Sequence, residues 1–118
     1  MSIATFTLPF PISVNKAYAN GGNRRGRHTT KRTTDWKIEA AKALVAQAVP
    51  MIEPPYHVHY QFGRPDNRRR DVFNYEKVLS DLLKKQDVIT DDRMIMRGIV
   101  EWCPQQEAGT VKVTVRTA

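Results

Sequence analysis

The chain has almost no cysteine and no long apolar run, and both absences narrow its class. Cys103 is the single cysteine in 118 residues, which excludes an internal disulfide and a zinc site built from several cysteines. The stretch richest in apolar residues, 40–51, contains Lys42 and Gln47 and is too polar to span a bilayer. The first residues lack the basic start and apolar core of a secretory signal. We therefore expect a cytoplasmic protein with no membrane partner.

Internal repeats, low-complexity tracts and linkers are also missing from the sequence. The hydrophobic fraction of 41% and the charged fraction of 26% are typical of a globular protein. A chain of 118 residues can bury one hydrophobic core but not two. The sequence therefore predicts one domain over residues 1–118.

Positive charge is in clear excess. The chain has 19 Lys and Arg against 12 Asp and Glu, which gives a net charge of +7 and a pI near 9.9. Such an excess on a small domain favours a polyanionic partner, of which nucleic acid is the commonest. An acidic membrane surface is the alternative, but it calls for a basic amphipathic helix. The basic residues here fall mostly in predicted loops, which favours nucleic acid.

Four stretches alternate apolar and polar residues, as half-buried strands do. The first is residues 3–8, which stop before Pro9 because proline cannot donate to a strand ladder. The others are residues 56–62, residues 95–102 and a stretch that begins at Gly109.

Two stretches have helical spacing. One should begin after a cap at Thr33 or Thr34 and end before Pro50. Its predicted apolar face consists of Trp36, Ile38, Ala41, Leu44, Val45 and Ala48. The other runs over residues 72–85. Residues 20–32 combine turn formers with dense positive charge and predict a flexible loop. The order β-α-β-α-β-β predicts an α/β or α+β fold, with one mixed sheet packed against two main helices.

Three features carry candidate chemistry, and each also has a purely structural interpretation. Asp71 follows Arg68, Arg69 and Arg70, and it can simply be the N-cap of the second helix. Asn74, Lys77 and Asp81 share one helix face, which can be an ordinary solvated surface. Asp91 and Asp92 precede a strand and can be turn residues.

Taken together, these features fit the hydrolysis of a phosphodiester. The reaction needs an activated water and a stabilised leaving oxygen, and Mg²⁺ between carboxylates supplies both. Mg²⁺ keeps several waters, so two or three carboxylates from separate segments suffice to bind it. A lysine nearby can hold the scissile phosphate, and arginines can bind its neighbours. Asp71, Lys77 and Asp92 form such a set if the second helix begins beside the turn before the third strand.

Two segments resemble the RusA family of crossover-junction endodeoxyribonucleases. Residues 68–95 contain RRRDVFNYEKVLSDLL followed by VITDDRMI, and residues 7–18 read TLPFPISVNKAY, similar to the family's Pro-x-Pro-(x)₃-Asn segment. Gly26 and Arg27 also lie where the family has them. The resemblance runs over nearly the whole chain.

The resemblance implies specific roles. Asp71 and Asp92 match acidic residues of the metal site, Lys77 matches a catalytic lysine, and Asp91 would ligate or orient the metal. Asn74 matches the asparagine at the start of the helix. The family acts as a homodimer that introduces paired nicks across a four-way DNA junction, with Mg²⁺ as the metal and Mn²⁺ as a possible substitute.

One residue departs from the family's pattern. Members read Asp-x-Asp-Asn at the helix start, whereas Phe73 stands here in place of the second aspartate, and it cannot bind Mg²⁺. Either Glu76 or Asp81 compensates, or the site works with fewer ligands, or the protein binds junctions without cutting. Phe73 would contact unpaired bases at a junction, or pack against the core or a dimer partner, and we favour packing.

The main hypothesis is therefore a dimeric, Mg²⁺-dependent nuclease that resolves four-way junctions. Asp71, Lys77 and Asp92 are the predicted catalytic residues, and Asp71, Asp91 and Asp92 the metal ligands. The predicted DNA contacts are Arg24, Arg25, Arg27, Lys31, Arg32, Arg68, Arg69 and Arg70. The rival hypothesis is a catalytically impaired protein that binds branched DNA, and a third is a general binder of nucleic acid with no preference for branches.

Overall fold

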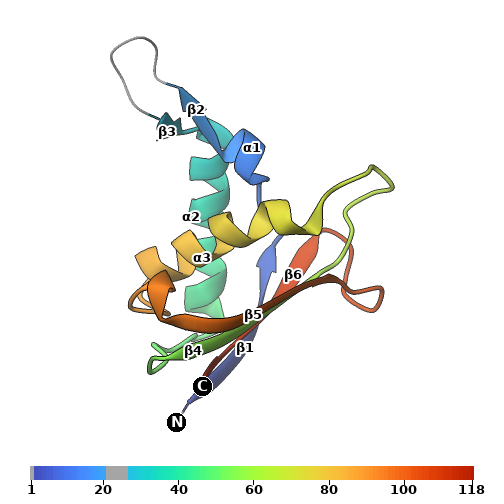
Figure 1. Ribbon diagram of the computed structural model, residues 1–118. Helices are drawn as coiled ribbons and strands as arrows, with labels where there is room; N and C mark the ends of the chain where they lie inside the picture. Colours follow the sequence, from blue (N-terminus) through green and yellow to red (C-terminus); the bar gives the residue numbers. More distant parts are fainter. Residues whose placement is uncertain (1, 21–26) are drawn as a thin grey trace.

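Four strands form the central sheet of the computed structural model, which describes residues 2–20 and 27–118 (Figure 1). They are β1 (Ile3–Pro9), β4 (Tyr56–Phe62), β5 (Ile95–Trp102) and β6 (Thr110–Thr117), and their order in the sheet is β1-β6-β4-β5. Strand β6 runs antiparallel to β1 and β4, whereas β4 and β5 are parallel. The predicted mixed sheet is thereby confirmed.

One face of the sheet is buried and the other is not. In β4 the aromatic and aliphatic residues are buried and alternate with half-buried polar ones. Strand β6 follows the same rule, with Val111, Val113 and Val115 fully buried. Side chains alternate across a strand, so every second residue meets the core. Helices cover only this apolar face, and we call the opposite one the helix-free face.

The first long helix, α2 (Lys31–Ala46), begins earlier than predicted. Its N-cap is Thr30, whose hydroxyl accepts a hydrogen bond from the Thr33 backbone at 3.4 Å, so a cap at Thr33 or Thr34 is wrong. The buried stripe consists of Thr33, Trp36, Ala40 and Leu44. Two predicted apolar-face residues, Ile38 and Val45, lie off this stripe and are 51% and 81% exposed, and a third, Ala48, lies beyond the end of the helix.

The second helix has two parts. A 3-10 turn, η1 (Val72–Tyr75), precedes the α-helix α3 (Glu76–Lys85). The predicted helix over residues 72–85 is therefore helical throughout, but its first turn is tighter than an α-helix. The leucine face is confirmed, since Val78, Leu79, Leu82 and Leu83 are buried.

Residues 27–32 are not the predicted flexible loop. A short helix, α1 (Val14–Ala17), leads into β2 (Tyr18–Asn20), which pairs antiparallel with β3 (Arg27–Thr29), and α2 follows. Backbone hydrogen bonds hold this small ladder, and the Thr30 backbone N–H donates to the Ala17 carbonyl at 3.0 Å. Such pairing needs no apolar alternation, so the sequence pattern did not indicate it. None of the helices in the described parts of the chain has the length and apolar character needed to cross a bilayer.

Candidate active site

An aromatic cluster fixes η1 against the ends of β4 and β5. The Tyr75 ring lies 4.9 Å from that of Phe10, 5.7 Å from that of Phe62 and 6.2 Å from that of Trp102, measured between centroids. Tyr75 is buried, so the turn that carries Asp71 to Asn74 is held to the sheet by packed rings. This packing sets where the first candidate residues lie.

Asp71 caps η1, as its structural interpretation predicted. Its Oδ1 accepts a hydrogen bond from the Phe73 backbone at 3.0 Å, and the side chain is exposed. The backbone of Asn74 donates to the Asp71 carbonyl at 3.0 Å. Asp71 is therefore a fixed, solvent-facing carboxylate.

Asp91 and Asp92 lie at a second 3-10 turn, η2 (Asp92–Met94), directly before β5. Asp91 Oδ1 accepts from the Arg93 backbone at 2.9 Å, and Oδ2 accepts from the Arg93 guanidinium at 2.9 and 3.2 Å. These hydrogen bonds hold the pKa of Asp91 well below its usual range. Asp91 is therefore held in place and ionised at neutral pH.

A hydrogen-bonded chain leads from the core to the acidic side of α3. The Tyr60 hydroxyl is 2.8 Å from Ser80 Oγ, which donates to Glu76 Oε2 at 2.9 Å. Burial raises the pKa of Tyr60, and the charges of Glu76, Asp81 and Asp92 raise it further. Asp92 and the acids of α3 thus act on the same buried hydroxyl, although they come from segments separated in the sequence.

Lys77 lies beside Asp81 on the surface of α3. Its Nζ lies 3.5 Å from Asp81 Oδ2, and its side chain is 62% exposed. An ion pair that exposed is weak, so a phosphate can compete with Asp81 for the ammonium group. The predicted common face of Lys77 and Asp81 is confirmed.

The arginine run is organised by an acid that the sequence did not single out. Asp66 accepts from Arg68 at 3.1 Å and from Arg70 at 2.5 Å, and these contacts hold its pKa well below the usual range. The Arg70 side chain is only 18% exposed. The sequence signal for this arrangement is the spacing, because Asp66 precedes Arg68 by two residues and Arg70 by four.

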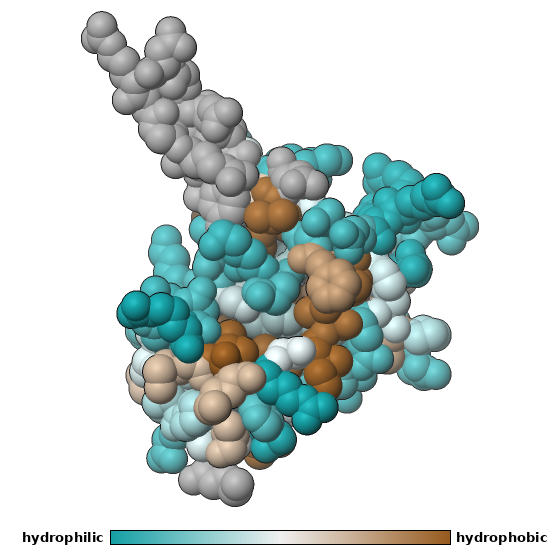
Figure 2. Space-filling model, viewed as in Figure 1, coloured by the Kyte–Doolittle hydropathy of each residue, from teal (hydrophilic) through white to brown (hydrophobic). Residues whose placement is uncertain are grey.

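The same arginines line a cationic pocket of about 260 Å³ between η1, α1 and α2. Lys16 and Arg32 enter it from the two helices, Arg68 and Arg70 from the loop, and Tyr75 forms part of its wall. Lys16 was not predicted, because one lysine in a short helix carries no signal until the fold brings other cations to it. Figure 2 shows this side of the molecule as mostly hydrophilic around smaller apolar areas.

The remaining predicted DNA contacts are only partly described. Arg24 and Arg25 lie outside the described residues, and only the backbone of Arg27 is described. Lys31 is exposed and lies 3.3 Å from Asp35 within α2, and Arg69 is exposed on the loop.

Phe73 does not pack in the core. It is 72% exposed at η1, so the interpretation of this residue as a core contact is wrong. Asp71 caps the turn and Tyr75 anchors it, and between them Phe73 projects into solvent, whereas Val72 and Asn74 are half-buried. A contact with DNA or with another copy of the chain stays a prediction.

The predicted carboxylates do not converge into a complete metal site. Within residues 2–20 and 27–118, no three acidic, histidine or cysteine residues lie close enough together to hold a metal ion. Asp91 and Asp92 are adjacent at η2, and η2 contacts α3, the helix that carries Glu76 and Asp81.

Comparison with known proteins accounts for nearly the whole chain. The model of the family described as endodeoxyribonuclease RusA matches residues 9–116. The crossover junction endodeoxyribonucleases RusA of Escherichia coli strain K12 and of Enterobacteria phage 82 are each 26% identical over 116 residues, covering 98% of this chain and 95% of the relative. The protein of that name from Shigella sonnei is 25% identical over the same shares. The chain therefore belongs to the RusA family of endodeoxyribonucleases, enzymes that hydrolyse phosphodiester bonds in DNA.

Proposed function

We propose that the protein is a metal-dependent, structure-selective endodeoxyribonuclease that resolves four-way junctions by paired nicks. The observation that carries this proposal is that η2, which holds Asp91 and Asp92, lies against α3, where Lys77 pairs with Asp81. The names of the relatives, which act at crossover junctions, supply the substrate.

Asp71, Asp91 and Asp92 would hold the metal, with Mg²⁺ as the expected ion and Mn²⁺ as its substitute. Carboxylate oxygens are the ligands that these hard cations prefer, and Mg²⁺ keeps several waters, so the Asp91–Asp92 pair fits as a donor set. The bound ion supplies an activated water and stabilises the leaving oxygen. Glu76 and Asp81 on α3 would compensate for the aspartate that the family has at the position of Phe73.

The chain's own cations position the DNA. Lys77 would leave Asp81 for the scissile phosphate and stabilise its developing negative charge. Arg32, Arg68, Arg70 and Lys16 would bind a neighbouring phosphate in their pocket. Two symmetric nicks require two active sites related by a two-fold axis, so the active form would be a homodimer.

A second candidate function is binding of branched DNA without cutting. The position of Phe73 favours it, because an exposed ring stands where a ligand is expected and no three-carboxylate group is formed in the described part of the chain. On this alternative the acidic residues serve only as caps and ion pairs.

The deciding experiment is cleavage of a synthetic four-way junction beside a matched linear duplex, with Mg²⁺, Mn²⁺ or EDTA, resolved on a denaturing gel. The proposed function predicts metal-dependent, paired nicks confined to the junction. Asp92→Asn should abolish cutting and leave junction binding intact, while Asp35→Asn on α2 is the control. Cutting by Asp92→Asn at the wild-type rate would refute the proposed site, and selective binding without cutting would favour the second candidate.

A further inference from the structure

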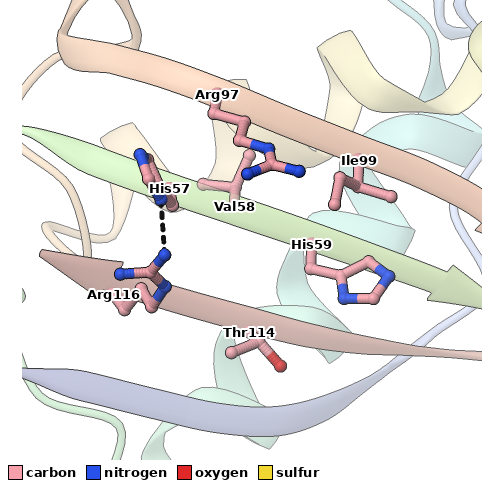
Figure 3. A pocket seen from close by; sticks show the side chains of 7 residues that line it. All are labelled: His57, Val58, His59, Arg97, Ile99, Thr114 and Arg116. Atoms are coloured by element: carbon pink, nitrogen blue, oxygen red, sulfur yellow. Dashed lines mark hydrogen bonds between the residues drawn. The ribbon is translucent and has the colours of Figure 1, made fainter. Parts of the chain in front are cut away.

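The helix-free face carries a pocket that contains none of the predicted site residues. It has a volume of about 200 Å³ and opens over β5, β4 and β6 (Figure 3). Most of its lining faces away from the helices and is polar, with His57 and His59 from β4, Arg97 from β5, and Thr114 and Arg116 from β6. Nothing in the proposed cleavage chemistry uses these residues.

Sheet register places three of them in one row. His57 is the partner of Arg97 on β5 and of Arg116 on β6, so the two arginines flank one histidine. Neighbouring strands lie about 4.8 Å apart, so about 10 Å separates the outer two backbones. Both guanidinium groups can reach a common point above His57. The next row along β4 is formed by Ile99, His59 and Thr114.

Hydrogen bonds order this pocket, and among the described residues no acid accepts one from its two arginines. Arg116 Nη2 donates to His57 Nδ1 at 2.7 Å, drawn as the dashed line in Figure 3. A neutral imidazole accepts this bond, so the Arg116 charge is not compensated. His59 Nε2 contacts Glu101, an acid that does not line the pocket. Of the described residues that do line it, none is acidic.

Arg97 and Arg116 flank one histidine, and no acid is among the described residues that line the pocket, so the two arginines have the charge and donors for a phosphate. Guanidinium groups bind phosphate oxygens through paired N–H donors, and a hydroxyl such as that of Thr114 can add another. The same face carries Lys112, four positions before Arg116 on β6 and on the same side of the strand. That spacing corresponds to about 13 Å along a strand. A single phosphate cannot span this distance, but a DNA backbone can.

We propose that the helix-free face binds the backbone of a DNA arm, with one phosphate held between Arg97 and Arg116. The inference rests on the proposed function in taking DNA as the ligand, but it concerns a surface on the other side of the sheet from the carboxylates. A branched substrate sends its arms in several directions, so contacts on two faces would grip more than one arm. Sequence-independent contacts of this kind add affinity and depend strongly on salt.

The test compares Arg97→Gln/Arg116→Gln with the wild type by fluorescence anisotropy on a four-way junction in EDTA, at several salt concentrations. Each phosphate that the protein no longer neutralises reduces the steepness of log K against log salt by about 0.9. We expect the double variant to leave about one to two phosphates unneutralised and to bind roughly tenfold more weakly at moderate salt. Lys42→Gln/Lys84→Gln, which removes two exposed charges from the helices, is the matched control and should change the slope less.

Two further measurements keep the result interpretable. Thermal unfolding checks that the variant folds, since Arg116 also bonds to His57. The cutting rate at saturating protein should be unchanged, because these arginines lie away from the carboxylates. A double variant that binds DNA no more weakly than the control variant overturns the proposal. The proposal also fails if the pocket binds inorganic phosphate, detected through the His57 signals in NMR, but the double variant binds DNA with unchanged affinity. Weakened binding by the double variant, together with a wild type that does not cut, would support this surface and refute the proposed function.

Discussion

The hydrogen-bonded chain of Tyr60, Ser80 and Glu76 provides a quantitative test of how α3 is joined to the sheet. Tyr60 is fully buried and Ser80 is 3% exposed, and their oxygens lie 2.8 Å apart. Within the described residues, no buried side-chain nitrogen or oxygen is left without a hydrogen bond. Ser80→Ala would leave the Tyr60 hydroxyl buried with no partner.

The expected energies are unequal. An unsatisfied buried hydroxyl costs about 1–3 kcal/mol, so Ser80→Ala should destabilise by that amount. Tyr60→Phe removes the hydroxyl and leaves Ser80 its bond to Glu76, at a cost of about 1 kcal/mol. The double variant has no orphaned group and should cost less than the sum, with a coupling of about 1–2 kcal/mol. At roughly 4 °C per kcal/mol, Ser80→Ala alone should lower Tm by about 4–12 °C.

The assay is urea and thermal unfolding of the wild type, both single variants and the double variant, followed by circular dichroism. Thr114→Ala, a hydroxyl deletion on the helix-free face, is the control and should stay within about 0.5 kcal/mol. Free energies of the two single variants that simply add in the double variant would refute the reasoning, because they would show that the two hydroxyls do not depend on each other.

Three other changes test separate parts of the structure. Gly63→Ala should destabilise the protein by at least about 2 kcal/mol in urea unfolding, because its Cβ would overlap the Glu107 carbonyl oxygen and lie 2.7 Å from the carbonyl carbon. Gly98→Ala, whose Cβ would have its nearest contact at 3.5 Å, is the control, and equal stability of the two variants would contradict the expectation. Phe73→Asp should increase the affinity for Mn²⁺ in calorimetry and leave the free energy of unfolding within about 0.5 kcal/mol, because the side chain is exposed. Phe73→Ala is the control, and an equal gain in Mn²⁺ affinity from alanine would rule out a ligand effect. Arg93→Gln should strengthen Mn²⁺ binding severalfold at neutral pH, because in the wild type the Arg93 guanidinium donates to Asp91 Oδ2. Unchanged or weaker Mn²⁺ binding would show that Arg93 does not compete with the metal.

The elements that the sequence predicted well are those in which one face is buried. In β4 and β6 the apolar residues alternate with polar ones, and a shift of one residue would turn the whole set toward solvent. That constraint is visible in the sequence. The leucine face of α3 was predictable for the same reason, at the helical period.

The start of α2 and the β2–β3 pair could not be predicted in this way. Four threonines surround the helix start, and any of them can cap it, so only the backbone position decides that Thr30 does. The small ladder depends on backbone hydrogen bonds, which leave no pattern in the side chains. Long-range proximity is equally hidden, which is why Lys16 and Asp66 were missed although each lies among predicted cations.

The candidate acids show that capping and metal binding are not competing interpretations of the same residue. Each cap uses one oxygen, Oδ1 of Asp71 and Oδ1 of Asp91, to accept a backbone N–H. Asp71 Oδ2 accepts no hydrogen bond from the described residues, and Asp91 Oδ2 accepts hydrogen bonds from the exposed guanidinium of Arg93. A carboxylate held by its cap has already lost much of its rotational freedom, so a cation that binds the second oxygen orders less of the chain. The caps at η1 and η2 would therefore favour metal binding, and the structural interpretation of each aspartate supports its proposed function.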